Sequence, residues 1–153
     1  MKNTKFLVKT DSKNYPIYLG YNLLNNFQRI LNQNLNHVNK IAILVDHNSP
    51  SKILENLKRS LKKFNITIFK LKGGEKIKNI KIANKLVESL LKKNFNRTDC
   101  IIAFGGGVIG DLSAFVASIT KRGIKFINIP TTLLAQVDAS IGGKTAVNST
   151  QGK

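Results

Sequence analysis

The sequence has no apolar run that could cross a membrane, and it is poor in cysteine. A membrane-spanning helix needs about 18 or more consecutive apolar residues, and a secretory signal needs an apolar stretch of about 7 to 15 residues near its start. Neither pattern occurs in the 153 residues, and the single cysteine, Cys100, excludes an internal disulfide. We therefore expect a cytoplasmic protein without a membrane partner.

Residues of the types that bind transition metals are also scarce. The two histidines, His37 and His47, lie in unrelated segments, and no group of Cys, His and carboxylate residues has the spacing of a zinc site. Cys100 begins an apolar run that ends at Phe104, a pattern typical of a buried and unreactive thiol. We therefore expect that this stretch of chain, by itself, does not bind a metal.

Acidic residues are few: there are 8 Asp and Glu against 25 Lys and Arg, which gives a formal net charge of +17. Such an excess is common in nucleic-acid-binding proteins. An interface for nucleic acid would combine clustered cations with stacking aromatic residues, whereas this chain has no Trp and scatters its lysines over the expected outer faces of helices. Lys, Asn and Ile share AT-rich codons, so compositional drift also explains the charge, and we expect no nucleic-acid partner.

Apolar runs of strand length alternate with apolar residues at helical spacing. This alternation predicts βαβ units, and so a Rossmann-like, mostly parallel α/β sheet with helices on both faces, formed by residues 1–153 as one domain. Two short strands are expected first, at 6–8 and 15–19. The later strands are expected at 41–45, 66–69, 100–104 and 126–129, and the helical stripes at 24–31, 53–64, 83–91 and 108–119.

Ligands of such sheets bind at the carboxyl ends of the strands. The loops expected there cover 46–48, 71–78, 105–111 and 130–132. Although the chain has only eight acidic residues, three of them fall in these loops, which suggests specific roles for Asp46, Glu75 and Asp111.

Gly105, Gly107 and Gly110 match the pattern G-x-G-x-x-G between a strand and a helix. Glycines there let the backbone approach a pyrophosphate, which the amides of the helix N-terminus can bind. The alternative is a turn that needs glycine only for tight packing.

The dinucleotide pattern also requires an acid that binds the ribose, and none lies near position 130. Asp46, from another loop, is the candidate that could take this role. The alternatives are that Asp46 caps the next helix and that Asp111 is a first-turn helix acid.

The sequence Gly143-Lys144-Thr145 resembles the end of a phosphate loop. It is not a Walker A motif, because Asp138 stands where that motif requires glycine. Lys144 is nevertheless a candidate anion-binding lysine, because two glycines precede it. The alternative, which holds for most lysines of so basic a chain, is a solvated surface charge.

Three segments together closely resemble 3-dehydroquinate synthases: GGGVIGDL at 105–112, KRGIKF at 121–126 and PTTLLAQVDASIGGKTAVN at 130–148. Residues 74–78 are similar to the family's G-E-x-x-K element, and residues 46–48 to its D-x-N loop. The resemblance implies an NAD-dependent phosphate lyase of the shikimate pathway. Such an enzyme converts 3-deoxy-arabino-heptulosonate 7-phosphate, a phosphorylated sugar acid, to 3-dehydroquinate and phosphate.

The resemblance also implies roles for individual residues. The residues implied to face the substrate are Arg122, Asp138, Lys144 and Lys153. The residues implied to bind NAD are Asp46, Asn48, Gly74, Glu75, Lys78, Gly106, Gly107, Val108, Ile109, Gly110, Asp111, Thr131, Thr132, Lys144 and Lys153.

Members of this family carry a second, mostly helical domain, which supplies a Glu and two His as ligands for a divalent metal, zinc or cobalt. We therefore expect this chain to be the N-terminal half of a two-domain enzyme, inactive alone, with exposed apolar surface where the second domain would pack, and homodimeric when complete. The alternatives are another sugar-phosphate cyclase, a metal-dependent alcohol dehydrogenase, or a fragment that only binds NAD or dimerises.

Overall fold

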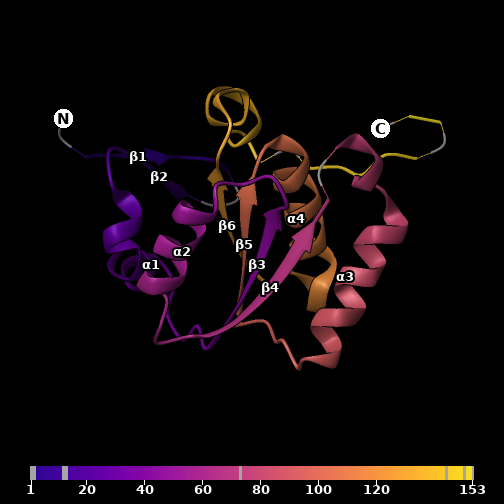
Figure 1. Cartoon of the computed structure of the whole chain (residues 1–153), viewed down its shortest axis with the longest axis horizontal. Coiled ribbons are helices and arrows are strands. Elements are labelled where there is room, and N and C mark those ends of the chain that lie inside the picture. Colours follow the sequence, from indigo (N-terminus) through magenta and orange to yellow (C-terminus); the bar gives the residue numbers. More distant parts are fainter. Residues whose placement is uncertain (1–2, 12–13, 73, 144, 150, 153) are drawn as a thin grey trace.

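A four-stranded parallel sheet forms the centre of the molecule in this computed structural model (Figure 1). The structure describes residues 3–11, 14–72, 74–143, 145–149 and 151–152. The strands are β3 (Lys40–Asp46), β4 (Asn65–Leu71), β5 (Cys100–Gly105) and β6 (Lys125–Pro130), and their order across the sheet is β4-β3-β5-β6. The parallel α/β architecture inferred from the alternating pattern is confirmed.

Helices cover both faces of this sheet. One face carries α1 (Phe27–Asn34), which follows the 3₁₀ turn η1 (Leu23–Asn26), and α2 (Ser51–Ser60). The other face carries α3 (Ile80–Lys92) and α4 (Gly107–Ile119). No helix within the described ranges is long and apolar enough to span a membrane.

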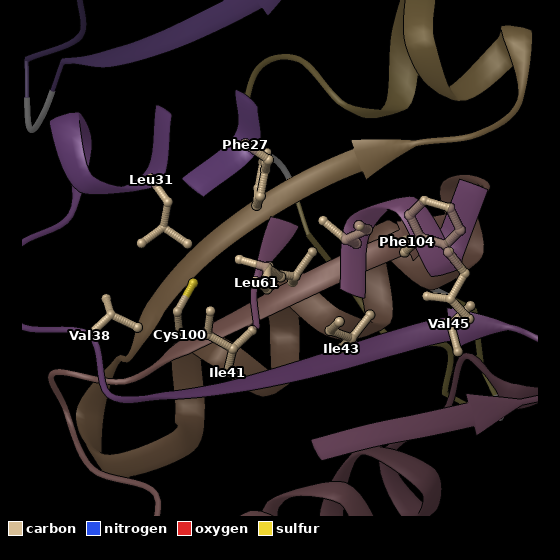
Figure 2. Close-up of a cluster of buried hydrophobic side chains, with 12 residues drawn as sticks. Phe27, Leu31, Val38, Ile41, Ile43, Val45, Leu61, Cys100 and Phe104 are labelled. Atoms are coloured by element: carbon tan, nitrogen blue, oxygen red, sulfur yellow. The ribbon is translucent and has the colours of Figure 1, made fainter. Parts of the chain in front are cut away.

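The two faces have separate hydrophobic cores, because successive side chains of a strand point to opposite sides. Ile41, Ile43 and Val45 of β3 pack with Cys100, Ile102 and Phe104 of β5 against α1 and α2, and Figure 2 shows this cluster. Ala42, Leu44 and Ile101 pack against α3 and α4. The central strands β3 and β5 are therefore buried on both faces, whereas the edge strands are half-buried.

At one end of α2 and of α4, a residue predicted to lie on the buried face of the helix is exposed. Ile53 and Ile119 were expected to face the core but are 41% and 44% exposed. In α2 the buried residues are Leu54 and Leu57, with Leu61 buried just after the helix. Ile53 lies at the margin of this face because adjacent helical residues differ by about 100° in direction. Phe64 lies beyond the end of α2 and packs from a turn, where its amide donates to the carbonyl of Leu61.

Two segments outside the main sheet expose large apolar side chains. The predicted N-terminal strands, β1 (Thr4–Val8) and β2 (Tyr15–Leu19), pair with each other as an antiparallel hairpin in a sheet of their own. Phe6, Leu7 and Leu19 of this hairpin are more than half exposed. After β6 the chain forms a π-helical turn, η4 (Ala135–Ala139), which projects above the sheet in Figure 1 and beside which Leu133 is 76% exposed.

Cys100 is fully buried in the first core, as the sequence predicts. Burial raises the pKa of its thiol from 9.0 to about 12.

Because the thiolate is the reactive form, we expect a chromogenic disulfide reagent to leave Cys100 unmodified at pH 8 in the folded protein and to modify one thiol per chain in guanidinium chloride. Since folding raises this pKa, the contribution of Cys100 to stability is lost as the pH rises from about 9 towards 12. Rapid modification of the folded protein at pH 8 would contradict its burial.

Candidate functional site at the carboxyl edge of the sheet

The four loops predicted to bind a ligand open at the same edge of the sheet. Strand pairing places Asp46 beside Leu71, Val45 beside Phe104, and Gly105 beside Pro130. The chain leaves β3 towards β4 on one side and then crosses back to β5 on the other side of β3. In open α/β sheets, ligands bind at such a switch point. The candidate site is therefore centred between the carboxyl ends of β3 and β5.

The loop after β3 is shaped by Asp46 itself. The amide of Asn48 donates to Asp46 Oδ1 at 2.9 Å, and the amide of Ser49 donates to the Asp46 carbonyl at 2.9 Å. The N-cap of α2 is Pro50, and no side chain caps the helix. The alternative that Asp46 caps this helix is therefore wrong. Its carboxylate instead closes an Asx turn, which holds the side chain at the switch point.

The glycines at the end of β5 and the start of α4 are closely packed, and Gly105 leaves no room for a side chain. A Cβ atom at Gly105 would lie 2.8 Å from the side chain of Ile109, and one at Gly106 would lie 3.3 Å from Thr132 Cγ2. A Cβ at Gly110 would lie 3.2 Å from the side-chain nitrogen of Asn128. Tight packing thus accounts for these glycines, and their pattern alone is not evidence for a ligand.

The same turn places the N-terminus of α4 at the switch point. Gly106 is the N-cap, and the amide of Gly110 donates to its carbonyl at 3.0 Å as the first bond of the helix. The amides of Gly107, Val108 and Ile109 precede this bond and therefore have no acceptor within the helix. They give this end of α4 a positive potential that suits an anionic group.

The loop after β4 reaches over to α4 through an ion pair between Lys78 Nζ and Asp111 Oδ2. The side chain of Lys78 is 6% exposed and that of Asp111 is 23% exposed. Gly74 and Glu75 precede Lys78 and are exposed, and Glu75 begins the 3₁₀ turn η2 (Glu75–Ile77). Asp111 is the fifth residue of α4, and the first turn of this helix contains no acid, so the alternative that Asp111 is a first-turn helix acid is wrong. Its partner is Lys78.

Two residues that the sequence did not single out as functional complete this cluster. Thr145 Oγ1 donates to the carbonyl of Asp111 at 2.6 Å, and the amide of Asn148 donates to the carbonyl of Lys78 at 2.7 Å. Asn148 Nδ2 also donates to Glu75 Oε1 at 2.8 Å. Their position directly after the Gly-Gly-Lys motif was the only signal in the sequence, and it gave no indication of these contacts.

Thr131, Thr132 and Asp138 follow β6 at the same edge. The amide of Thr131 donates to the carbonyl of Gly105, and Thr132 Oγ1 accepts from the amide of Ala135. Asp138 is exposed on η4. This turn packs on the start of α4, since Ala139 would lie 3.2 Å from a Cβ placed at Gly107.

Arg122 is not brought together with these residues. It lies in the 3₁₀ turn η3 (Thr120–Arg122), just before β6, and so at the amino edge of the sheet. The six residues of β6 separate it from the carboxyl edge by roughly 20 Å. Within one chain, Arg122 therefore does not share a site with Asp138. The other two predicted substrate-facing residues, Lys144 and Lys153, lie outside the described residues.

The described residues contain no group of three or more His, Cys, Asp or Glu side chains that could hold a metal ion. Two acids of the carboxyl edge are engaged elsewhere: Asp111 pairs with Lys78, and Glu75 accepts from Asn148. These residues do not fit a metal centre.

Comparison with known proteins identifies the family. The family model for the N-terminal part of 3-dehydroquinate synthase matches residues 68–153. The chain belongs to the 3-dehydroquinate synthase family. The 3-dehydroquinate synthase of Pelagibacter ubique is 46% identical over 149 residues, an alignment that covers 97% of this chain and 40% of that protein. The chain thus spans about 40% of the length of this relative.

Solved structures show the same fold in related cyclases. A 2-deoxy-scyllo-inosose synthase, solved with carbaglucose-6-phosphate, NAD⁺ and Co²⁺, matches 98% of this chain and 41% of its own with a TM-score of 0.87 at 26% identity. A 2-epi-5-epi-valiolone synthase from Streptomyces hygroscopicus, with NAD⁺ and Zn²⁺ bound, matches 72% of this chain and 31% of its own with a TM-score of 0.66 at 28% identity. The α/β fold of this 3-dehydroquinate synthase family member is therefore shared with these cyclases.

Proposed function

We propose that the carboxyl edge of the sheet binds NAD at the switch point between β3 and β5. One geometric observation carries this proposal: the N-terminus of α4 and the Asp46 loop lie on either side of the switch point. The chain in which they do so belongs to the 3-dehydroquinate synthase family. The cyclases of similar fold that were solved with NAD⁺ support the same ligand.

The proposal assigns residues of this edge to the parts of a dinucleotide. Asp46, whose carboxylate is bonded to the amide of Asn48, would accept the ribose hydroxyl groups. The amides of residues 107–109 would bind the pyrophosphate. The remaining proposed contacts among the described residues come from Gly74, Glu75, Lys78, Gly106, Gly110, Asp111, Thr131 and Thr132. Lys144 and Lys153, which the family resemblance implies, are proposed from the sequence alone. When bound, NAD supplies the transient oxidation and reduction of one carbinol of the substrate.

The activity that we propose for the whole enzyme is that of 3-dehydroquinate synthase, a phosphate lyase that forms 3-dehydroquinate from 3-deoxy-arabino-heptulosonate 7-phosphate. Asp138, Lys144 and Lys153 would face the substrate, whose carboxylate and phosphate suit the cations. The divalent metal would be zinc or cobalt, the metals present in the related cyclase structures, and its ligands would lie outside the residues described here. We propose that the chain is inactive without those ligands and that the complete enzyme is a homodimer.

Another sugar-phosphate cyclase is the competing assignment, because the related structures are of such enzymes. Sequence identity favours 3-dehydroquinate synthase, at 46% against 26% and 28%.

Calorimetric titration of the folded chain with NAD tests the proposed binding. We expect the Asp46→Asn variant to bind NAD about tenfold more weakly, because the amide keeps the acceptor for Asn48 but loses the charge that strengthens a hydrogen bond to a hydroxyl. Asp11→Asn, an exposed acid in the hairpin connection, is the matched control and should bind like the wild type. Absence of binding by the folded wild type would refute the proposal, and equal affinity of Asp46→Asn would remove Asp46 from the site.

A further inference from the structure

We propose that residues 145–148 act as a strap that positions Glu75 and Lys78 against α4, with Asn148 as its main positioning residue. The inference rests on the proposed function in one respect, namely that these two residues contact NAD. The strap itself follows from the contacts of the described residues.

The strap is bonded to the main chain of both members of the buried ion pair. Thr145 Oγ1 donates to the carbonyl of Asp111, and the amide of Asn148 donates to the carbonyl of Lys78. The ion pair then closes the ring between the side chains of Lys78 and Asp111. The two hydrogen bonds and the ion pair therefore all hold the loop after β4 close to the first turns of α4.

The side chain of Asn148 adds a contact that only a donor can make. Its Nδ2 donates to Glu75 Oε1 at 2.8 Å, and an isolated parallel bridge between Asn79 and Asn148 aligns the two backbones. Glu75 is exposed, so the bond from Asn148 is a specific constraint on its carboxylate. The strap is anchored beside this contact because Val147 packs against the core of α3 and α4. We conclude that Asn148 sets the direction of the Glu75 carboxylate.

The strap also connects two loops of the candidate site. It continues from Gly142 and Gly143, and the amide of Gly142 donates to the hydroxyl of Tyr15 at 3.3 Å. The strap thus follows the Gly-Gly-Lys motif in the sequence and contacts the loop that we assign to NAD.

Hydrogen exchange and NAD titration on the full chain test this proposal. In Asn148→Ala and Thr145→Val we expect the amides of Ile77 and Lys78, which close the η2 turn, to exchange about five to ten times faster, because each variant loses one hydrogen bond. We expect NAD affinity to fall by a similar factor. Thr145→Ser keeps the hydroxyl and should restore both values. Ser149→Ala is the control, since just beyond the strap it loses a 2.8 Å bond to the carbonyl of Gly152 and a 3.2 Å bond from the amide of Gln151, neither of which involves Glu75, Lys78 or Asp111.

The outcomes separate the strap from the proposed function. If both variants exchange like the wild type at Ile77 and Lys78, the strap is refuted, whatever NAD does. If exchange accelerates but affinity is unchanged, the positioning role of Asn148 is refuted. If exchange accelerates and the folded wild type does not bind NAD, the strap is upheld as a structural element and the proposed NAD site fails. Should Asn148→Ala not fold, Thr145→Val makes the same measurement from the other end of the strap.

Discussion

Replacing Asp111 with alanine should destabilise the chain by about 3 kcal/mol, because it leaves the ammonium of Lys78 buried without its partner. The side chain of Lys78 is 6% exposed, so the carboxylate of Asp111 supplies much of what compensates its ammonium for lost hydration. For a domain of this size, such a loss corresponds to a fall in unfolding midpoint of about 6 to 12 °C. Thermal unfolding followed by circular dichroism measures it.

The opposite single variant and the double variant are the controls. Lys78→Met leaves the carboxylate of Asp111, which is 23% exposed and can be hydrated, so we expect a loss of only about 1 kcal/mol. Lys78→Met combined with Asp111→Ala removes both charges and should be more stable than Asp111→Ala alone. A double variant less stable than Asp111→Ala would show that the unpaired ammonium is not the cause.

Truncation of Phe104 to alanine should cost about 3 to 5 kcal/mol, since its fully buried ring fills the core of α1 and α2 directly beneath the switch point. Figure 2 shows this side chain beside Val45. The carbonyl of Phe104 also accepts from Ser49 Oγ at 3.4 Å, so we expect NAD binding to weaken as the Asp46 loop loosens. Urea unfolding gives the free energy, and calorimetry gives the affinity.

Two further variants calibrate the effect of Phe104. Phe104→Leu keeps most of the buried volume and should lose less than half as much. Phe6→Ala removes the same ring from the β1 hairpin, where it is 51% exposed, and should change the free energy of unfolding by less than about 1 kcal/mol. An effect of Phe104→Ala no larger than that of Phe6→Ala would contradict the packing described for the core.

The fold was predictable because the strands of a covered parallel sheet are marked by continuous apolar runs. The runs at 41–45 and 100–104 became β3 and β5, which are buried on both faces, and the flanking stripes became helices. The limits of α2 were less predictable. Leu61 and Phe64 continue its spacing beyond Ser60, and only the packing of the following turn decides where the helix ends.

The site was predictable only in part. The rule that ligands meet the carboxyl ends of parallel strands located its loops, and the scarcity of acids singled out Asp46, Glu75 and Asp111. The pairing of Lys78 with Asp111 and the contacts of Asn148 span 33 and 73 residues of sequence and leave no periodic signal. The resemblance grouped Arg122 with Asp138, but the topology of β6 places them at opposite edges of the sheet.

The order of the strands has a consequence for how the domain forms during synthesis. β5 is made after β4 but inserts beside β3, so one apolar edge of β3 stays open until residues 100–105 have left the ribosome. The contacts of Asn148 with Lys78 and Glu75 close later still. The contacts at the carboxyl edge thus join segments that are made early in synthesis to segments that are made late.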